Sequence, residues 1–199
     1  MLEDYPKEVI LKNGEEVTLD LMVKEDERKL HEFFLRLPEE DRLCLKSNVV
    51  DPNVIKSWAQ NMNYDHIVPI LSKKGDRIVG DATLHRRTID PPQNVGEIRI
   101  VTDRDFRRVG LGTRLAKEIY YLALNKKMNK LIAEIAADQK NVRKTFQHLG
   151  FEEEKILEKQ VVDLHGNKHD LVVMTQDVDA LWKKIKDLID KDTAHYSRG

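Results

Sequence analysis

The sequence predicts an α/β protein with a mixed α+β sheet that is covered by helices on both faces. Runs of alternating or β-branched residues recur along the chain, turn residues separate them, and segments with helical apolar spacing lie between them. The expected order is two strands, two helices, three strands, a helix, a strand, a helix, two strands and a final helix. This order is typical of a mixed sheet.

The first third of the chain predicts a hairpin and two helices. Residues 8–23 alternate on either side of Asn13-Gly14, and Asn-Gly between such arms is the strongest short signal for a β-hairpin. Residues 24–37 repeat apolar side chains at helical spacing. Residues 51–61 predict a second helix, which begins after Asp51-Pro52.

The middle of the chain predicts three strands and a long helix. Residues 65–71 and 76–88 flank a Lys-Lys-Gly turn and predict an antiparallel pair, which leads into a loop at residues 90–92. The β-branched run at residues 96–103 predicts the next strand. After a polar turn, apolar residues recur at helical spacing over residues 111–125 and predict a helix.

The last third predicts a strand over residues 130–136 and a short helix over residues 140–148, which Gly150 ends. Two strands near residues 153–164 and 169–175 follow. We expect residues 1–199 to form a single domain. Its parts are a core over about residues 8–175, a final amphipathic helix over residues 177–191 and a loose tail over residues 193–199.

The composition excludes several classes of function. The 34 Lys and Arg nearly balance the 35 Asp and Glu, so the net charge of −1 gives no electrostatic case for a nucleic-acid partner. No apolar run approaches the ~20 residues of a membrane span, and the N-terminus has no signal-peptide core, so we expect a cytoplasmic protein without a membrane partner. Cys44, the one cysteine, fits a reducing compartment and is interpreted as a buried structural thiol rather than a nucleophile.

The stretch RRVGLGTRL, residues 107–115, places two glycines where a strand leads into a helix. The first turn of a helix has unpaired N–H groups and the positive end of the helix dipole, and glycines let a phosphate approach the backbone. The stretch therefore predicts an anion site. A tight turn whose glycines only supply positive φ explains the same spacing, and these residues alone do not decide between the two.

Two motifs follow one another on the expected elements. The strand-to-helix junction reads Arg107-Arg108-Val109-Gly110-Leu111-Gly112, and the later short helix ends in Leu149-Gly150-Phe151. They match the Q/R-x-x-G-x-G/A signature and the L-G-F feature of GNAT-superfamily N-acetyltransferases, which the chain resembles over about residues 8–175. The pattern is most similar to the acetyltransferase domain of bacterial protein-lysine acetyltransferases. The short segment at residues 33–42 also resembles that subgroup, and it fits an ordinary amphipathic helix equally well.

The resemblance implies the GNAT acyl-CoA N-acyltransferase fold, a central, mostly antiparallel sheet flanked by helices, with acetyl-CoA as co-substrate and no metal. In GNAT proteins the loop amides bind the pyrophosphate, a strand segment pairs with the pantetheine arm, and an asparagine before the short helix, matched here by Gln139, contacts the cofactor. The implied cofactor-binding residues are Ile100, Val101, Thr102, Arg107, Arg108, Val109, Gly110, Leu111, Gly112, Thr113 and Gln139.

Catalysis needs a base, because a lysine-like amine with a pKa of ~10.4 is almost wholly charged at neutral pH. Glu97 is the predicted general base, since it precedes Arg107 by the offset of the catalytic glutamate in GNAT domains that resemble bacterial protein-lysine acetyltransferases. The structural alternative is an ion-paired strand carboxylate next to Arg99. Asp81 and His85, on the neighbouring strand, are the reserve candidates.

The sequence departs from the family pattern at the general acid. Phe146 stands where many GNAT enzymes have a tyrosine that protonates the leaving thiolate. The protein-lysine subgroup also lacks this tyrosine, and a thiolate with a pKa near ~8.5 can leave with help from water.

The predicted function is acetyl-CoA-dependent acetylation of a primary amine by direct attack in a ternary complex. A protein lysine is the preferred acceptor and a small-molecule amine the second choice. The competing class is a non-catalytic domain that binds or senses acyl-CoA. Because the final helix either packs on the domain or mediates dimerisation, the sequence allows a monomer or a homodimer.

Overall fold

The computed structural model describes residues 2–87, 94–163 and 165–180. The strands are β1 (Lys7–Ile10), β2 (Glu16–Leu21), β3 (Ile67–Lys74), β4 (Arg77–Arg87), β5 (Val95–Thr102), β6 (Lys130–Ala136), β7 (Glu152–Val162) and β8 (Lys168–Asp177). The α-helices are α1 (Glu27–Arg36), α2 (Glu39–Arg42), α3 (Pro52–Gln60), α4 (Leu111–Asn125) and α5 (Lys140–His148). Short 3-10 helices are η1 (Leu2–Asp4), η2 (Lys24–Asp26) and η3 (Arg104–Phe106).

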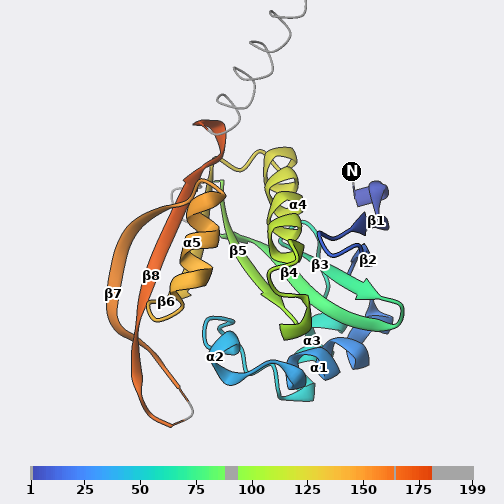
Figure 1. Ribbon diagram of the computed structural model, residues 1–199, viewed down its shortest axis with the longest axis horizontal. Helices are drawn as coiled ribbons and strands as arrows, with labels where there is room; N and C mark the ends of the chain where they lie inside the picture. The colour runs from blue at the N-terminus through green and yellow to red at the C-terminus, as the bar shows by residue number, and fades with distance from the viewer. Residues whose placement is uncertain (1, 88–93, 164, 181–199) are drawn as a thin grey trace, which may run out of the picture.

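The strands form one sheet in the order β1-β2-β3-β4-β5-β6-β8-β7 (Figure 1). All neighbouring pairs are antiparallel except β5 and β6, which are parallel because α4 crosses between them. The structure therefore confirms the predicted mixed, mostly antiparallel sheet with helices on both faces.

Each strand and helix predicted within the described residues is present, with ends that differ by a few residues. The sequence missed α2, a single turn after Pro38 that is too short for a periodic signal. The loop predicted at residues 90–92 lies outside the described residues. So does the tail, residues 193–199, and so does the predicted final helix beyond its helical start at residues 178–180.

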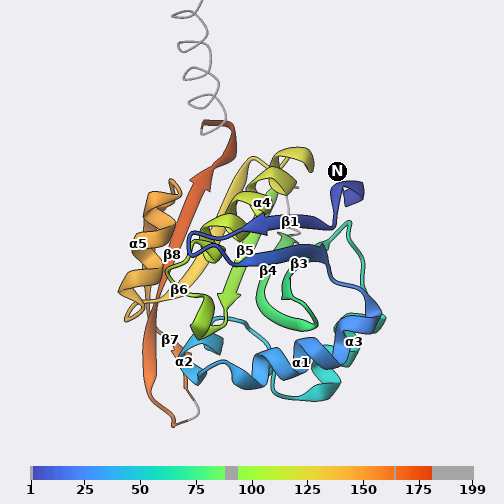
Figure 2. The same ribbon diagram turned by 45° about the vertical axis from the view of Figure 1, so that its right-hand side comes forward.

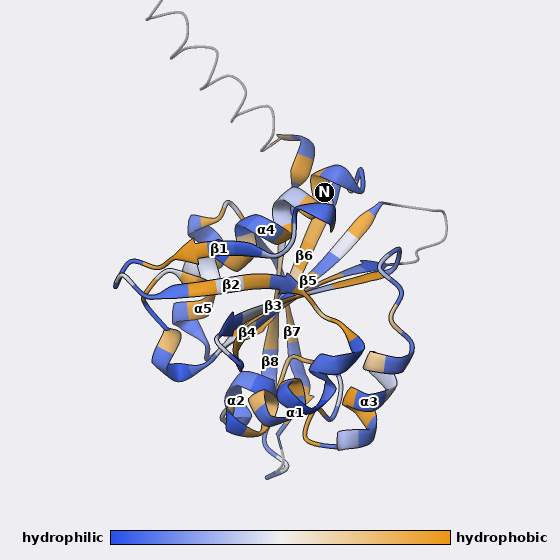
Figure 3. Ribbon diagram, turned by 90° about the vertical axis from the view of Figure 1, so that its right-hand side faces the viewer, coloured by the Kyte–Doolittle hydropathy of each residue, from blue (hydrophilic) through white to orange (hydrophobic). Residues whose placement is uncertain are grey.

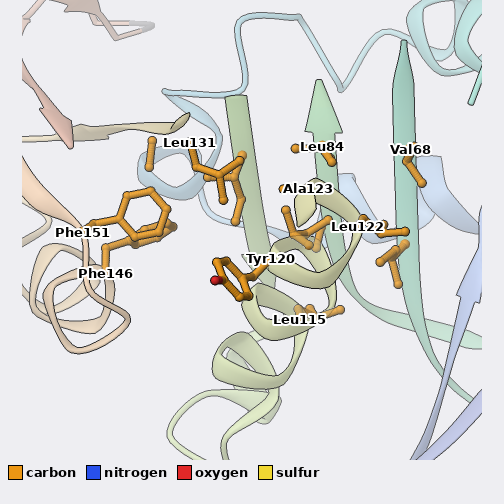
Figure 4. Packing of buried hydrophobic residues seen from close by; sticks show 14 of the residues in the cluster. Val68, Leu84, Leu115, Tyr120, Leu122, Ala123, Leu131, Phe146 and Phe151 are labelled. Carbon is orange, nitrogen blue, oxygen red and sulfur yellow. The ribbon is translucent and has the colours of Figure 1, made fainter. Parts of the chain in front are cut away.

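Two apolar layers hold the sheet between the helices. One layer packs α4 and α5 on the sheet, and Figure 4 shows Leu115 and Leu122 of α4 together with Phe146 and Phe151. The other layer packs α1 and α3 on the opposite face, through residues such as Phe34. Figure 2 shows α4 on one side of the strands and α1 with α3 on the other, and Figure 3 shows that these helices carry hydrophilic and hydrophobic residues together. Among the described helices, none has the length and apolarity needed to cross a bilayer.

Gly96 lies where β5 meets β6 under the first layer. A Cβ at this position would come within 2.6 Å of the sulfur of Met128, 2.8 Å of Leu84 and 2.9 Å of Leu131. Real Cβ atoms do not approach neighbours so closely, because the overlap forces side chains or backbone to shift. The close packing of these three side chains on the parallel pair therefore requires a glycine.

We predict that Gly96→Ala lowers the free energy of unfolding by about 1–3 kcal/mol, the usual cost of overpacking a core. Urea unfolding measures the change. The matched control is Gly112→Ala, because a Cβ at Gly112 meets no atom within 4 Å, and its stability should stay equal or rise slightly. Equal stability of Gly96→Ala and the wild type would contradict this account of the parallel pair.

Candidate active site

The parallel pair of the sheet ends early. β5 pairs with β6 only through Val95, Gly96 and Glu97. Beyond Glu97, β5 keeps its partner β4 as far as Thr102, while β6 continues beside β8 to Ala136. The edge of β5 that faces β6 therefore has no strand partner among the described residues after Glu97. In Figure 1 the two halves of the sheet diverge here, with α2 at the open end.

The strand segment predicted to pair with the pantetheine arm lies on this open edge. Ile100, Val101 and Thr102 are partly exposed and have β4 as their one strand partner. A strand edge without a partner presents backbone N–H and C=O groups to an extended ligand. The fork thus supplies the kind of edge that an extended thioester arm requires.

The predicted anion loop follows β5 and η3 directly. Gly110 is the N-cap of α4, in the left-handed conformation with φ of 92°, and Arg108 is left-handed as well, with φ of 62°. The backbone amides of residues 108–113 donate no hydrogen bond to any acceptor in the described part of the chain. A run of free amides at the start of a long helix is a site for a phosphate or another anion.

The two explanations of the glycine spacing apply to different glycines. Gly110 supplies the positive φ that starts the helix, which an L side chain adopts only with strain. Gly112 has no positive φ, and a Cβ there would point into open space. The lack of a side chain at Gly112 therefore leaves the start of α4 accessible to a ligand, and the backbone conformation at Gly112 does not require a glycine.

The other residues of the loop divide between the core and the surface. Leu111 is fully buried under the sheet, and the carbonyl of Val109 accepts a hydrogen bond from the amide of Lys12 at 3.0 Å. Arg107, Arg108 and Thr113 are exposed. The two arginines place positive charge at the rim of the free amides.

Helix α2 lies against several of the predicted cofactor residues. Asp41 pairs with Arg107, and the carbonyl of Glu40 accepts a hydrogen bond from the amide nitrogen of Gln139 at 2.7 Å. The carboxylate of Glu40 also lies 3.1 Å from Arg104. The helix that the sequence missed thus joins the loop before α4 to the start of α5 across the fork.

Glu97 is the centre of a buried ion network at the fork. The residue is about 5% exposed, and its carboxylate lies 2.9 Å from Lys46, 2.6 Å from Arg87 and 2.8 Å from Arg99. Lys46 and Arg87 each lie 2.7 Å from Glu134 of β6 as well. These two cations therefore bridge the two strands at the point where their backbones separate.

The network keeps Glu97 ionised. Burial alone would raise its pKa, but the hydrogen bond from Lys46, the charge of Arg99 and the hydrogen bonds from Arg87 and Arg99 outweigh burial and lower the pKa to about 2. A carboxylate stabilised in this way accepts a proton poorly. The role of Glu97 as general base stays a prediction, and the geometry weighs against it.

A cavity of about 550 Å³ lies on the α1 and α3 side of the sheet, and its surface is mainly apolar. Asp81, Thr83 and His85 line it from β4, and Arg99 lines it from β5. Because alternate residues of a strand share one face, these side chains form a polar strip along one wall. Apolar residues of the other walls are Met22, Leu30, Phe34, Leu45, Trp58, Met62, Ile67 and Pro69.

Asp81 and His85, the reserve candidates for the general base, both line this cavity, and Glu97 does not. Burial raises the pKa of Asp81 to about 7, although the hydroxyl of Thr83, which donates to it at 3.1 Å, and the charge of Arg99 oppose the shift. Burial lowers the pKa of His85 to about 4. At neutral pH, His85 is a neutral imidazole and Asp81 is near its titration midpoint.

Phe146 has a packing role. It is buried, and its ring lies edge-on to Phe151 at 5.1 Å in the layer under α5. Among the described tyrosines, none lines the cavity.

Cys44 is only partly buried, which differs from the predicted burial, but burial still raises the pKa of its thiol to about 11. The thiol is thus protonated and poorly nucleophilic at neutral pH. Among the described residues, no group of three or more His, Cys, Asp or Glu side chains is placed to hold a metal.

Sequence reasoning missed most of the ion network and the cavity. Lys46, Arg87 and Glu134 lie in three separate elements, and nothing in their spacing joins them. The one available signal was Glu134, a charged residue within the short apolar run of residues 130–136. Such a residue in a strand between two neighbours is buried and paired more often than it is free.

The family model described as Acetyltransferase (GNAT) family matches residues 23–151, which include the fork, the loop and both sides of the cavity. The chain belongs to the GNAT acetyltransferase family. It is therefore an acetyl-CoA-dependent N-acyltransferase. The free amides, the open side of Gly112 and the unpaired edge of β5 fit the co-substrate that this GNAT membership implies.

Solved structures share the GNAT fold at low sequence identity. The GNAT domain of S. lividans PAT is 14% identical, with 87% of this chain and 97% of that chain covered and a TM-score of 0.73. Salmonella typhimurium yncA, solved with its cofactor acetyl-CoA, is 17% identical, with 81% and 94% covered and a TM-score of 0.67. A ribosomal-protein-alanine N-acetyltransferase from Brucella melitensis is 21% identical, with 80% and 98% covered and a TM-score of 0.67. No curated protein matches the sequence.

We predict that Gly112→Val weakens acetyl-CoA binding at least tenfold, or about 1.4 kcal/mol, because the branched side chain fills the open space in front of the amides. Calorimetry measures the dissociation constant. The control is Tyr121→Val, which changes an exposed residue further along α4 and should leave the affinity unchanged. Unchanged affinity in a folded Gly112→Val protein would remove the loop from the cofactor site.

A second prediction concerns stability. Glu97→Gln should lower the free energy of unfolding by roughly 2 kcal/mol, because three cations lose their buried partner. The folded pKa of about 2 lies below the value of ~4.3 for an unfolded glutamate. The contribution is therefore complete above pH ~4.3 and is lost as the pH falls towards ~2.

Denaturant unfolding at pH 7 and in acid tests this. The matched control is Glu154→Gln, which breaks the exposed pair with Lys130 and should cost less than about 1 kcal/mol. A Glu97→Gln protein as stable as that control at pH 7 would show that the network does not stabilise the fork.

Proposed function

We propose that this GNAT protein transfers the acetyl group of acetyl-CoA to a primary amine by direct attack in a ternary complex. One observation carries the proposal: the unpaired edge of β5 leads directly to a helix start whose amides are free. An extended arm along the strand and a diphosphate at the helix start fit these two features in sequence.

The proposed cofactor contacts follow from this placement. Ile100, Val101 and Thr102 bind the pantetheine arm through their backbone, and the amides from Arg108 to Thr113 bind the pyrophosphate. Arg107 adds positive charge at the rim, where its partner is now Asp41. Gln139 contacts the cofactor from the start of α5, where it now donates to the carbonyl of Glu40.

The proposed arm occupies the edge of β5 that faces β6. The acceptor amine approaches over the face of the sheet that α1 and α3 cover, through the cavity lined by Asp81 and Arg99. A protein lysine stays the sequence-based prediction for this acceptor. The size of the cavity supports the second choice, a small-molecule amine, because a lysyl arm occupies only a small part of about 550 Å³.

Direct attack is favoured because Cys44, the one cysteine, is not placed or activated to form an acetyl-enzyme. The thiol of Cys44 is protonated at neutral pH and does not line the cavity. The thiolate leaves without a tyrosine, since Phe146 occupies the position of the family acid and packs in the core.

We predict amine-dependent release of the CoA thiol with intersecting double-reciprocal plots, as a ternary complex requires. Initial rates over a grid of acetyl-CoA and amine concentrations measure this. Cys44→Ala should keep the wild-type kcat. Parallel plots together with loss of activity in Cys44→Ala would instead indicate an acetyl-cysteine intermediate. A protein that binds acetyl-CoA but releases no thiol with any amine would be a non-catalytic acyl-CoA-binding domain.

A further inference from the structure

The cavity contains one carboxylate that the ion network does not use. Asp81 is about 6% exposed, and its described partner is the hydroxyl of Thr83 at 3.1 Å. Among the described residues, no Lys, Arg or His lies within ion-pair distance of it. A buried carboxylate without a cation is costly, so its place on the wall of an open cavity requires an explanation.

The cations near Asp81 are occupied elsewhere. Lys46 and Arg99 line the same cavity, but both bind Glu97, and a guanidinium nitrogen of Arg99 also donates to the carbonyl of Leu45 at 2.8 Å. The two remaining titratable side chains of the wall are His66 and His85. Asp81 is therefore the single anion among the described residues of the wall, and Arg99, whose charge acts on Asp81, forms its ion pair with Glu97 instead.

The register of the sheet places Asp81 beside the proposed thioester arm. Asp81 pairs directly with Val101, whereas Glu97 pairs with His85, which lies on the same face of β4 but four residues further along. Directly paired residues of antiparallel strands have their Cβ atoms ~4.5–5.5 Å apart and on one face. Asp81 thus lies next to the centre of the segment proposed to bind the arm, on the side from which the acceptor enters.

We propose that Asp81 is the catalytic base and binds the ammonium group of the acceptor, and that the acceptor is a small primary amine with an apolar body. This rests on the proposed function. The ammonium enters the cavity, where Asp81 is the one opposite charge among the described lining residues. The apolar body packs against the wall that Phe34 and Trp58 form together, with their rings edge-on to each other at 6.0 Å.

The chemical step balances with these groups alone. The ammonium gives one proton to the carboxylate of Asp81, and the free amine nitrogen attacks the thioester carbon. A C–N bond forms and the C–S bond breaks, so that the CoA thiolate leaves. The second proton of the nitrogen passes to the thiolate or to water, and Asp81 returns its proton to solvent.

The structure gives Glu97 a positioning role in this scheme. Removing its charge frees Arg99 to pair with Asp81, and a paired guanidinium lowers the pKa of a carboxylate and so its basicity. The Asp81→Asn and Glu97→Gln variants should therefore differ in how kcat depends on pH. With Asp81 as the base, kcat of the wild type rises through pH 7, where His85 contributes nothing because its pKa is about 4.

The experiment measures thiol release by the full chain with phenethylamine, putrescine and a blocked peptide with one lysine. We expect phenethylamine to be the best acceptor. Asp81→Asn should lower kcat by about 10²–10⁴ and remove the acidic limb, with the acetyl-CoA dissociation constant unchanged. Glu97→Gln should keep an acidic limb, moved to lower pH. Asp20→Asn changes a carboxylate on β2 outside the cavity and should keep the wild-type rate and profile.

Thermal unfolding supplies a readout that does not need turnover. The folded pKa of Asp81, about 7, lies above the value of ~3.9 for an unfolded aspartate, so the wild type loses stability as the pH rises between these values. Asp81→Asn lacks this loss. Its melting temperature relative to the wild type should therefore be higher at pH 8 than at pH 5, which also shows that the variant folds.

Four results would overturn the proposal. A wild-type rate and acidic limb in Asp81→Asn would place the base elsewhere, and loss of the limb in Glu97→Gln alone would identify Glu97. Preference for putrescine or the peptide over phenethylamine would reject the apolar acceptor while the proposed function stands. If no amine releases thiol, the proposed function fails; calorimetry then tests the cavity by itself, and equal phenethylamine affinity in wild type and Asp81→Asn would reject it.

Discussion

The separation of β5 from β6 after Glu97 is the constraint on which the rest of the structure depends. Two parallel strands that begin to pair and then part leave backbone groups without partners, and such groups are costly unless a ligand or water satisfies them. The ion network at the fork stabilises this arrangement, because Lys46 and Arg87 link carboxylates on both strands. Gly96 allows close packing directly beneath it.

The same network separates the charges of the site. Glu97 pairs with Lys46 and Arg99, the two permanent cations among the described residues that line the cavity. As a result two adjacent strands carry unlike carboxylates: Glu97 on β5 is fully paired at the fork, and Asp81 on β4 faces the cavity without a cation. Burial raises the pKa of both groups, but at Glu97 the hydrogen bonds and charges of three cations outweigh burial, whereas at Asp81 burial prevails.

The sequence predicted the sheet and the loop well because both depend on local signals. Asn13-Gly14 fixed the first hairpin, β-branched runs marked the central strands, and the glycines at 110 and 112 marked the helix start. It did not predict α2, which is one turn long, or the partners of Glu97, which come from residues 46, 87 and 99 through the fold. The offset from Arg107 located a carboxylate at the fork, on the last residue of β5 that pairs with β6. Its environment depends on distant cations, which no spacing along the chain encodes.

The strand order has a consequence for synthesis of the chain. β8 lies between β6 and β7, so β6 has little more than the short contact with β5 until residues 168–177 have left the ribosome. The strands from β1 to β5 can pair as soon as each next neighbour emerges, because sequential strands are adjacent there. The half with the anion loop and the cavity can thus fold while the chain grows. The opposite side of the fork closes only after β8 has been synthesised.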